Sequence, residues 1–382
     1  MAQLVARAVW DREVVGSSPI TPTTNIEMKT NFSKLKETPK YLKSIWVSFS
    51  LFKKILFCLA LTSILVITGL RLIALRYQLS QKNQPEEFGT TFVSGYAEHF
   101  GLDPKQTFTA ILDDLKIKNV RLVSYWSEGE KEKGKYDFTD LDWQISEAEK
   151  RGVKVSLAIG LRQPRWPECH QPEWSKNLPK EEWYPSLKAY MTEVVKRYKD
   201  SPSLASYQLE NEYFLKDFGV CPDFSRDRLI EEFNLVKSLD SKTPIILSRS
   251  NNYGGFALGK PRADIFGISV YRKVHNKTLG YITYPFPAWY YAFLAQGQKI
   301  LTEKPSIIHE FQLEPWIKSG DIKDASIEEQ NKTMSAKDIK ANIQFARRTG
   351  IKEIYFWGAE WWYWRAQNGD PTIWNTVKEN LR

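Results

Sequence analysis

The sequence SYQLENEYF at residues 206–214 and the sequence PSIIHEFQLEPW at residues 305–316 each place a carboxylate at the end of an apolar strand. The first segment contains Asn211 and Glu212, and the second contains Glu310. Cleavage of a glycosidic bond needs two such groups, because one protonates the leaving oxygen while the other attacks the anomeric carbon or activates water. The two segments are therefore the first candidates for a catalytic site.

Short apolar strands alternate with amphipathic helices from about residue 90 onward. We expect strands at residues 90–96, 120–126, 153–160, 206–212, 244–250, 263–271, 305–311 and 353–361. Eight strands separated by helix-length connections predict an α/β fold in which a parallel sheet closes into a (β/α)₈ TIM barrel over residues 90–382. A doubly wound open sheet is the alternative, but no glycine-rich phosphate loop follows the first strand.

The C-terminal ends of the strands form the active site of such a barrel, so polar and aromatic residues there are candidate binding residues. Besides the two glutamates, the candidates are Arg121, Trp126, Trp166, Tyr271, Trp316, Trp357 and Glu360. Tryptophan faces pack against the apolar C–H faces of sugar rings. For Glu360, a sugar contact and a salt bridge with Arg365 are both open. Glu210 is expected to pair with a basic group, and Glu314 lies in the loop beyond its strand.

This pattern resembles the clan A retaining glycoside hydrolases, a (β/α)₈ family that includes cellulases, mannanases, xylanases, β-xylosidases and β-galactosidases. The family has an Asn-Glu dipeptide at the end of strand four and a nucleophilic Glu at the end of strand seven, which correspond to Asn211-Glu212 and Glu310. The segment GKYDFTDLDWQISEAEKRGVKV at 134–155 is similar to the second helix region of several members.

The resemblance implies a role for each of these residues. Glu212 is the acid/base and must be protonated near neutral pH, whereas Glu310 must be ionised to attack. Arg121 and Tyr271 would hydrogen-bond Glu310. Asn211 would bind the sugar 2-hydroxyl. The same resemblance implies that Trp357 lies under the sugar ring.

The chain has three cysteines and four histidines, and their positions bear on disulfide formation and metal binding. Cys169 and Cys221 lie in the loops after the third and fourth strands, which are neighbours, so an oxidising compartment would allow a disulfide between them. The histidines have no metal-ligand spacing, so we expect no catalytic metal and no cofactor.

The net charge of +9 is mostly an N-terminal feature. Residues 1–89 contain twelve Lys/Arg and six Asp/Glu, and thus carry +6 of the total. A nucleic-acid-binding role for the main domain is therefore not expected. Residues 1–27 resemble the translation product of a transfer-RNA gene and are expected to be a spurious or disordered extension before Met28.

One segment is apolar enough to enter a membrane. Residues 55–70 carry no charge, and apolar character continues to Leu75, so 51–75 approaches the roughly 20 residues that a bilayer requires. Seven lysines lie between Met28 and Lys54. The positive-inside rule then makes 28–50 a cytoplasmic segment, 51–75 a single-pass anchor in the cytoplasmic membrane, 76–89 a linker, and the barrel extracytoplasmic. A cleaved signal peptide is the alternative.

Two functional hypotheses follow. The favoured one is a membrane-anchored retaining β-glycoside hydrolase that acts on an oligosaccharide or polysaccharide, or a transglycosylase of the same mechanism. The alternative is a non-catalytic glycan-binding barrel. The paired glutamates favour catalysis, because a binding module gains nothing from burying two like charges together. The oligomeric state and the sugar are not indicated by the sequence.

Overall fold

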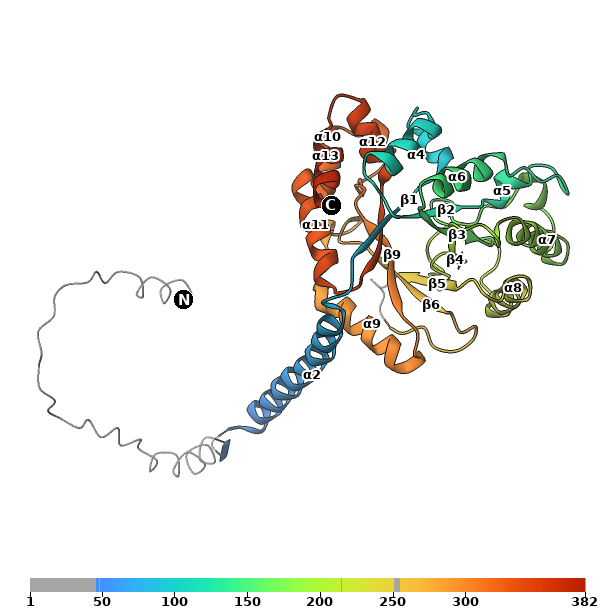
Figure 1. The fold of residues 1–382 in the computed structure, drawn as a ribbon. Helices are drawn as coiled ribbons and strands as arrows, with labels where there is room; N and C mark the ends of the chain where they lie inside the picture. The colour runs from blue at the N-terminus through green and yellow to red at the C-terminus, as the bar shows by residue number, and fades with distance from the viewer. Residues whose placement is uncertain (1–45, 48, 214, 251–254, 382) are drawn as a thin grey trace, which may run out of the picture. The chain divides into compact units, whose positions relative to one another are not determined.

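The structure is a computed structural model that describes residues 46–47, 49–213, 215–250 and 255–381. The segments expected at 1–27 and at most of 28–50 lie outside the described residues. Figure 1 shows the chain as a ribbon, with helices arranged around the strands. Contacts divide the chain into two compact units, residues 1–65 and residues 66–382.

Eight parallel strands close into a barrel, as the sequence predicted, in the order β1-β10-β9-β6-β5-β4-β3-β2. Its strands are β1 (Glu87–Thr91), β2 (Asn119–Val123), β3 (Lys154–Ile159), β4 (Leu204–Leu209), β5 (Ile245–Ser250), β6 (Ile265–Val270), β9 (Ser306–Gln312) and β10 (Glu353–Trp357). Their order around the barrel follows their order in the chain, so loops that succeed one another in sequence are neighbours at one rim.

Helices surround the barrel and connect its strands (Figure 1). They are α3 (Ser94–His99), α4 (Pro104–Asp113), α5 (Trp126–Gly129), α6 (Thr139–Lys150), α7 (Lys180–Tyr198), α8 (Arg226–Leu239), α9 (Ala288–Thr302), α10 (Ile327–Met334), α11 (Ala336–Arg348), α12 (Ala359–Gln367) and α13 (Thr372–Asn380), with 3₁₀ turns η1 (Glu173–Ser175) and η3 (Ile322–Asp324). Capping residues in the local sequence determine where several of these helices begin. Asp103 caps α4 by accepting from Gln106 N, and Ser335 with Asp338 forms a capping box on α11.

Side chains from three strands, two of them neighbours and one across the barrel, meet inside it. Ile246 on β5, Ile307 on β9 and Tyr355 on β10 are buried together in a small apolar cluster. β1 leaves room for this cluster at Gly89, where a Cβ would lie 2.6 Å from Asn119 O and 2.9 Å from the Tyr355 side chain. The interior is thus filled by side chains, which leaves the strand ends as the place for a site.

Some strands end earlier than the sequence predicted. β1 ends at Thr91, so Tyr96 belongs to α3, and β2 ends at Val123, so Trp126 begins α5. β10 ends at Trp357 because Gly358, with φ of 122°, turns the chain into α12 and carries Glu360 with it.

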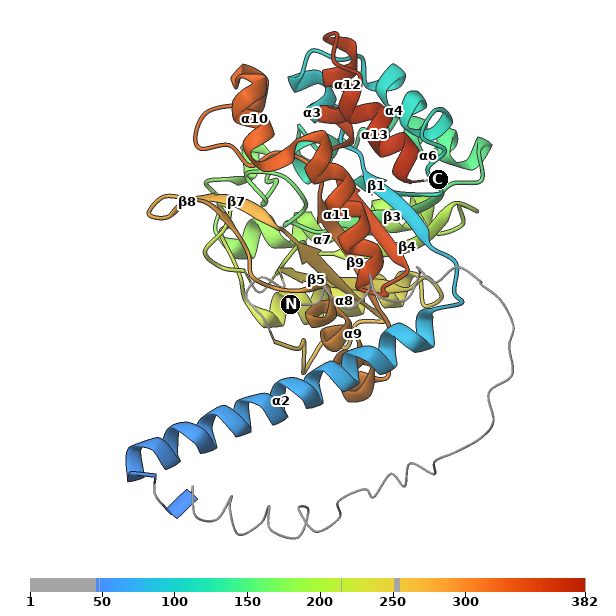
Figure 2. The ribbon, with the colours of Figure 1, turned by 90° about the vertical axis from the view of Figure 1, so that its left-hand side faces the viewer.

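An antiparallel hairpin that the sequence analysis did not anticipate follows β6. It consists of β7 (Lys273–Asn276) and β8 (Gly280–Thr283), and Figure 2 shows it projecting beside the barrel. Its strands have only four residues each, which is too short to show an alternation of apolar residues.

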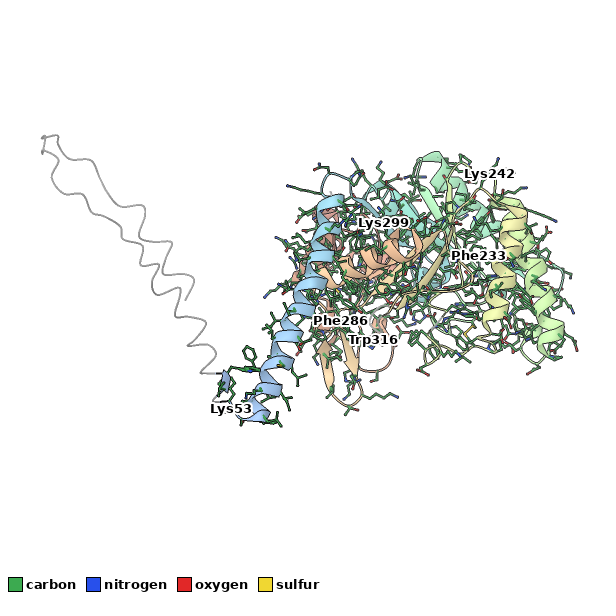
Figure 3. All side chains as sticks on the ribbon, turned by 90° about the horizontal axis from the view of Figure 1, so that it is seen from below. Lys53, Phe233, Lys242, Phe286, Lys299 and Trp316 are labelled. Carbon is green, nitrogen blue, oxygen red and sulfur yellow. A yellow bond between two sulfur atoms is a disulfide. The ribbon has the colours of Figure 1, made fainter. Side chains whose placement is uncertain are left out.

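Helix α2 (Leu51–Gln81) is, among the described residues, the one helix long and apolar enough to cross a membrane. Lys53 marks its N-terminal end in Figure 3. It continues past residue 75 into the stretch expected to be a linker. There Tyr77 is buried, and Gln78 Nε2 donates to the Arg348 carbonyl oxygen at 2.7 Å. Residues 76–81 therefore pack on the barrel unit and do not form a free tether.

Candidate active site

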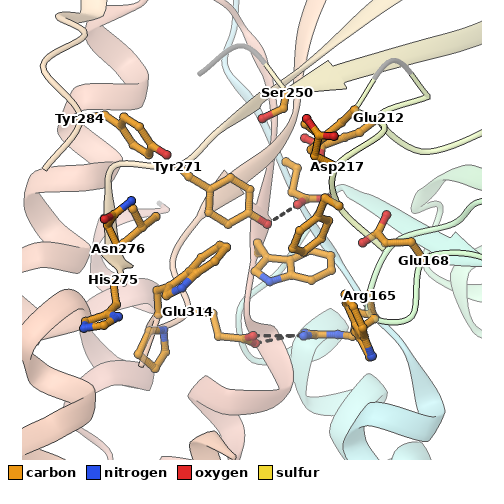
Figure 4. A pocket seen from close by; sticks show the side chains of 18 of the residues that line it. Arg165, Glu168, Glu212, Asp217, Ser250, Tyr271, His275, Asn276, Tyr284 and Glu314 are labelled. Carbon is orange, nitrogen blue, oxygen red and sulfur yellow. Dashed lines mark hydrogen bonds and ion pairs between the residues drawn. The ribbon is translucent and has the colours of Figure 1, made fainter. Parts of the chain in front are cut away.

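Glu212 and Glu310 line the same cavity, which has a volume of about 520 Å³ and lies at the C-terminal ends of the strands. Glu310 belongs to β9, and Glu212 follows β4 by three residues. Figure 4 shows Glu212 with part of the lining of this cavity. The two carboxylates, 98 positions apart in the sequence, are brought together by barrel closure.

Glu310 is held by two donors. Arg121 Nη2 lies 2.6 Å from Glu310 Oε2, and Nη1 of the same guanidinium donates to the His309 carbonyl oxygen at 3.0 Å. The hydroxyl of Tyr271, just beyond β6, donates to Glu310 Oε1. These two donors, one charged and one phenolic, fix the position of the Glu310 carboxylate.

Glu212 has a different environment. Its side chain is buried, and Oε1 has no hydrogen-bond partner among the described residues. Burial, and secondarily the charge of Glu310, raise the pKa of Glu212 to about 7. The backbone at Glu212 has φ of 41°, and its N–H donates to Ser248 Oγ at 3.0 Å. Strained backbone of this kind persists where surrounding contacts fix it, often at functional sites.

A third carboxyl group, Glu168, also lines the cavity and is not among the site residues expected from the sequence. It accepts from Asn211 Nδ2 at 3.1 Å, and its Oε2 lies 3.5 Å from Arg162 Nη2. Burial raises the pKa of Glu168 to about 8, and the charges of Glu212 and Glu310 add to this against the opposing charge of Arg162. Glu168 directly precedes Cys169 in the loop after β3, and this position was the feature of the sequence that could have indicated a site residue.

Asn211 does not line the cavity. Its Oδ1 accepts from Gln208 Nε2 at 2.8 Å and lies 3.4 Å from Ser248 Oγ, while Nδ2 donates to Glu168. The side chain is only 2% exposed. The Asn211 side chain thus has three protein partners, and the hydroxyl contact expected of it stays a prediction.

Three of the expected tryptophans line the cavity, namely Trp166, Trp316 and Trp357. Trp316 packs edge-on against Tyr271, with ring centroids 5.7 Å apart. The expectation for Trp126 was wrong. This side chain is fully buried, and its Nε1 donates to Glu130 Oε2 at 2.6 Å. Trp126 starts α5 and faces the protein interior, because β2 ends before it.

Glu360 is fully buried and forms no part of the cavity lining. It accepts from Val93 N at 2.7 Å, and its Oε2 lies 3.3 Å from Arg165 Nη2. The ion-pair partner is therefore Arg165 and not Arg365, which pairs with Asp370. Both the expected sugar contact and the expected salt bridge of Glu360 were wrong, because α12 turns this side chain inward.

Glu210 binds a basic group, as expected. Its carboxylate receives both Nη atoms of Arg228, at 2.9 and 3.0 Å, and the Leu161 N–H at 2.6 Å. These bonds join the end of β4 to α8 and to the end of β3, and so support the backbone that carries Glu212.

A disulfide joins Cys169 and Cys221, whose Cα atoms are 5.1 Å apart. It connects the loop after β3 to the loop after β4. Arg162 supports the same junction, because Nε donates to the Asn211 carbonyl oxygen at 2.6 Å and Nη1 to the Phe218 carbonyl oxygen at 2.8 Å. The disulfide and Arg162 together fix the loop that carries Glu168 beside Glu212.

Comparison with solved structures finds the same fold in glycoside hydrolases. An endo-β-1,4-xylanase of glycoside hydrolase family 10 from Gloeophyllum trabeum is 16% identical with a TM-score of 0.51, and the alignment covers 78% of this chain and 96% of that one. Xylanase 10B from Thermotoga maritima is 15% identical with a TM-score of 0.51, covering 82% of this chain and 97% of that one.

A β-galactosidase from Halorubrum lacusprofundi is 12% identical with a TM-score of 0.52, over 77% of this chain and 57% of that one. No protein-family model matches the sequence, and no curated protein is similar to it. The comparisons confirm the eight-stranded barrel and show that clan A glycoside hydrolases share it with this chain.

Proposed function

We propose that this protein is a retaining β-glycoside hydrolase that uses Glu310 as nucleophile and Glu212 as acid/base. The observation that supports this proposal best is that two carboxyl groups in one cavity have different environments. Arg121 and Tyr271 hold Glu310 in position, whereas burial raises the pKa of Glu212 to about 7. One group is thus suited to attack and the other to donate a proton.

The reaction would take two steps. In the first, Glu310 forms a bond to the anomeric carbon, the glycosidic C–O bond breaks, and Glu212 transfers its proton to the leaving oxygen. In the second, Glu212 takes a proton from water, which attacks the same carbon and releases Glu310. Two inversions at one carbon give net retention. A sugar hydroxyl that replaces the water would make the reaction a transglycosylation.

The exposed rim of the cavity supports a role for such an acceptor. Trp166 is 65% exposed and packs edge-on against Phe218, with ring centroids 6.0 Å apart. An exposed aromatic pair beside the acid/base offers a surface on which a sugar can stack.

A panel of aryl β-glycosides tests the proposal, with the anomer of the first-formed product read by proton NMR. We expect β-product from a β-substrate and no turnover by Glu310→Gln. Glu173→Gln, in the 3₁₀ turn η1 with an exposed side chain, is the matched control and should keep full activity. A folded wild-type protein that cleaves no glycoside and takes up no cyclophellitol-type probe would leave the glycan-binding alternative instead.

We also propose that α2 anchors the enzyme in the cytoplasmic membrane, with the barrel on the extracytoplasmic side. Apolar side chains cover the helix, and Leu59, Leu61 and Leu65 are each about half exposed or more. The lysines before the helix favour this orientation. Protease added to intact spheroplasts that express the full chain should degrade the barrel. Complete protection of the barrel would contradict this topology.

A further inference from the structure

An ion-pair cluster closes one edge of the cavity. Arg165 Nη1 and Nη2 contact Glu314 Oε1 and Oε2 at 3.0 and 3.1 Å, and Nη2 also contacts Glu360 Oε2 at 3.3 Å. Tyr96 Oη donates to Glu314 Oε1 at 3.2 Å, and the guanidinium carbon lies 3.2 Å from the Tyr96 ring centroid. The four residues come from the loop after β3, from the segment after β9, from α12 and from α3.

This cluster is largely buried and lies against Trp357. The side chains of Arg165, Glu314 and Glu360 are only 11%, 7% and 0% exposed. The Arg165 guanidinium carbon also lies 4.2 Å from the centroid of the Trp357 ring. A planar cation therefore already covers one face of the indole on which the family resemblance would place a sugar ring.

The position of the cluster relative to Glu212 indicates which end of a substrate meets it. In Figure 4 the Arg165–Glu314 pair lies at the opposite edge of the cavity from Glu212 and Ser250, with Tyr271 between them. During attack by Glu310, the glycosidic oxygen must face the acid Glu212. The leaving group then extends past Glu212, and the ring of the cleaved sugar extends towards the cluster.

The rim on the acid/base side is open by contrast. Trp166 and Phe218, from the loops after β3 and β4, line the cavity and are 65% and 36% exposed. The cavity thus has a closed, charged end and an open, aromatic end. Such an asymmetric shape differs from a groove that is open at both ends.

We propose that the site accepts one terminal, non-reducing sugar and releases it from the chain end, and that the Arg165–Glu314–Glu360 cluster sets this exo-action. The inference rests on the proposed function. Glu314 lines the cavity and offers acceptor oxygens to the outer sugar hydroxyls. Arg165 Nε has no hydrogen-bond partner among the described residues. A second sugar on the non-reducing side would displace the ion pair.

Two covalent probes applied to the full-length wild-type protein test the inference. One is a monosaccharide cyclophellitol epoxide, in the gluco, galacto, manno and xylo configurations. The other is the same epoxide carrying one further β-linked sugar on its non-reducing side. Intact mass spectrometry reports the labelling rate of each, and Glu310→Gln is the unreactive control.

We expect a monosaccharide probe to label at least ten times faster than its extended counterpart. Equal rates, or faster labelling by the extended probe, would overturn the exo-action while leaving the proposed hydrolase intact. Labelling by neither probe in any configuration would overturn the proposed function, and with it this inference.

A variant tests whether the ion-pair cluster causes the preference for the monosaccharide probe. Arg165→Ala combined with Glu314→Ala and Glu360→Gln removes both ion pairs of the cluster without leaving a charged partner alone. We expect the extended probe to gain at least tenfold in labelling rate relative to the monosaccharide probe. The control is an exposed pair, changed as Lys135→Ala with Glu132→Ala, which should leave the ratio unchanged. An unchanged ratio in a folded Arg165/Glu314/Glu360 variant would contradict the role of the cluster.

Discussion

Arg121 and Glu310 form a buried ion pair across the barrel, with Nη2 2.6 Å from Oε2 and side chains that are 0% and 5% exposed. They belong to β2 and β9, which are not neighbours in the barrel, and 189 positions separate them in the sequence. The pair therefore ties barrel closure directly to the position of the proposed nucleophile.

Arg121→Met should destabilise the protein and abolish activity. Removing one partner leaves a buried carboxylate uncompensated, which costs about 3–5 kcal/mol. Urea unfolding measures the loss, with Arg151→Met as the control. Arg151 pairs with the half-exposed Asp113 and with Glu147, and a solvent-accessible pair contributes only about 0–1 kcal/mol. Similar losses in the two variants would argue against a strong Arg121–Glu310 interaction.

The pH profile should report Glu212. Burial and the neighbouring Glu310 raise its pKa to about 7, so Glu212 is protonated below that pH and loses its proton above it. With a poor leaving group, kcat/KM should fall by about tenfold per pH unit above the pKa, because the reaction needs the protonated acid. Dinitrophenyl glycosides, which leave without proton transfer, should show a much weaker fall.

The activity lost on replacing Glu212 should also depend on the leaving group. Glu212→Ala should lower kcat/KM for poor leaving groups by about 10²- to 10⁴-fold, the usual contribution of general acid catalysis. A uniform loss across all leaving groups would indicate that Glu212 does not act as the acid.

Glu168→Gln should make stability less dependent on pH. Burial raises the pKa of Glu168 from 4.5 to about 8, so between these values the folded protein keeps a proton that the unfolded chain releases. Stability from this group is present below the lower value and is lost as pH rises towards the higher one, at about 1.4 kcal/mol per pKa unit. The Tm of the variant relative to the wild type should therefore rise over this window. A constant Tm difference would mean that Glu168 titrates normally.

The disulfide should stabilise the rim that carries Trp166. It closes a loop across a separation of 52 residues, for which chain entropy gives about 4 kcal/mol. Replacing both Cys169 and Cys221 by Ser should lower the free energy of unfolding and the activity together. Thiol counting on the denatured, unreduced protein should find Cys58 alone. Two further reactive thiols would rule the bridge out.

The sequence by itself determined the barrel and the positions of its two main carboxylates. Apolar runs of strand length predict buried parallel strands. A polar residue immediately after such a run lies at the end of that strand, whatever position the strand takes in the barrel. Glu212 and Glu310 could be found in this way because their positions depend on local pattern. The neighbouring loops of Cys169 and Cys221 follow from strand order alone.

Only the tertiary structure decided where loop side chains point. Arg165 meets Glu314 and Glu360, which are 149 and 195 positions away, and no local pattern connects them. Trp126 and Glu360 face inward because β2 and β10 end early and helices begin at once. Local sequence fixes the direction and end of a strand, whereas the orientation of a loop residue depends on partners that only folding brings close.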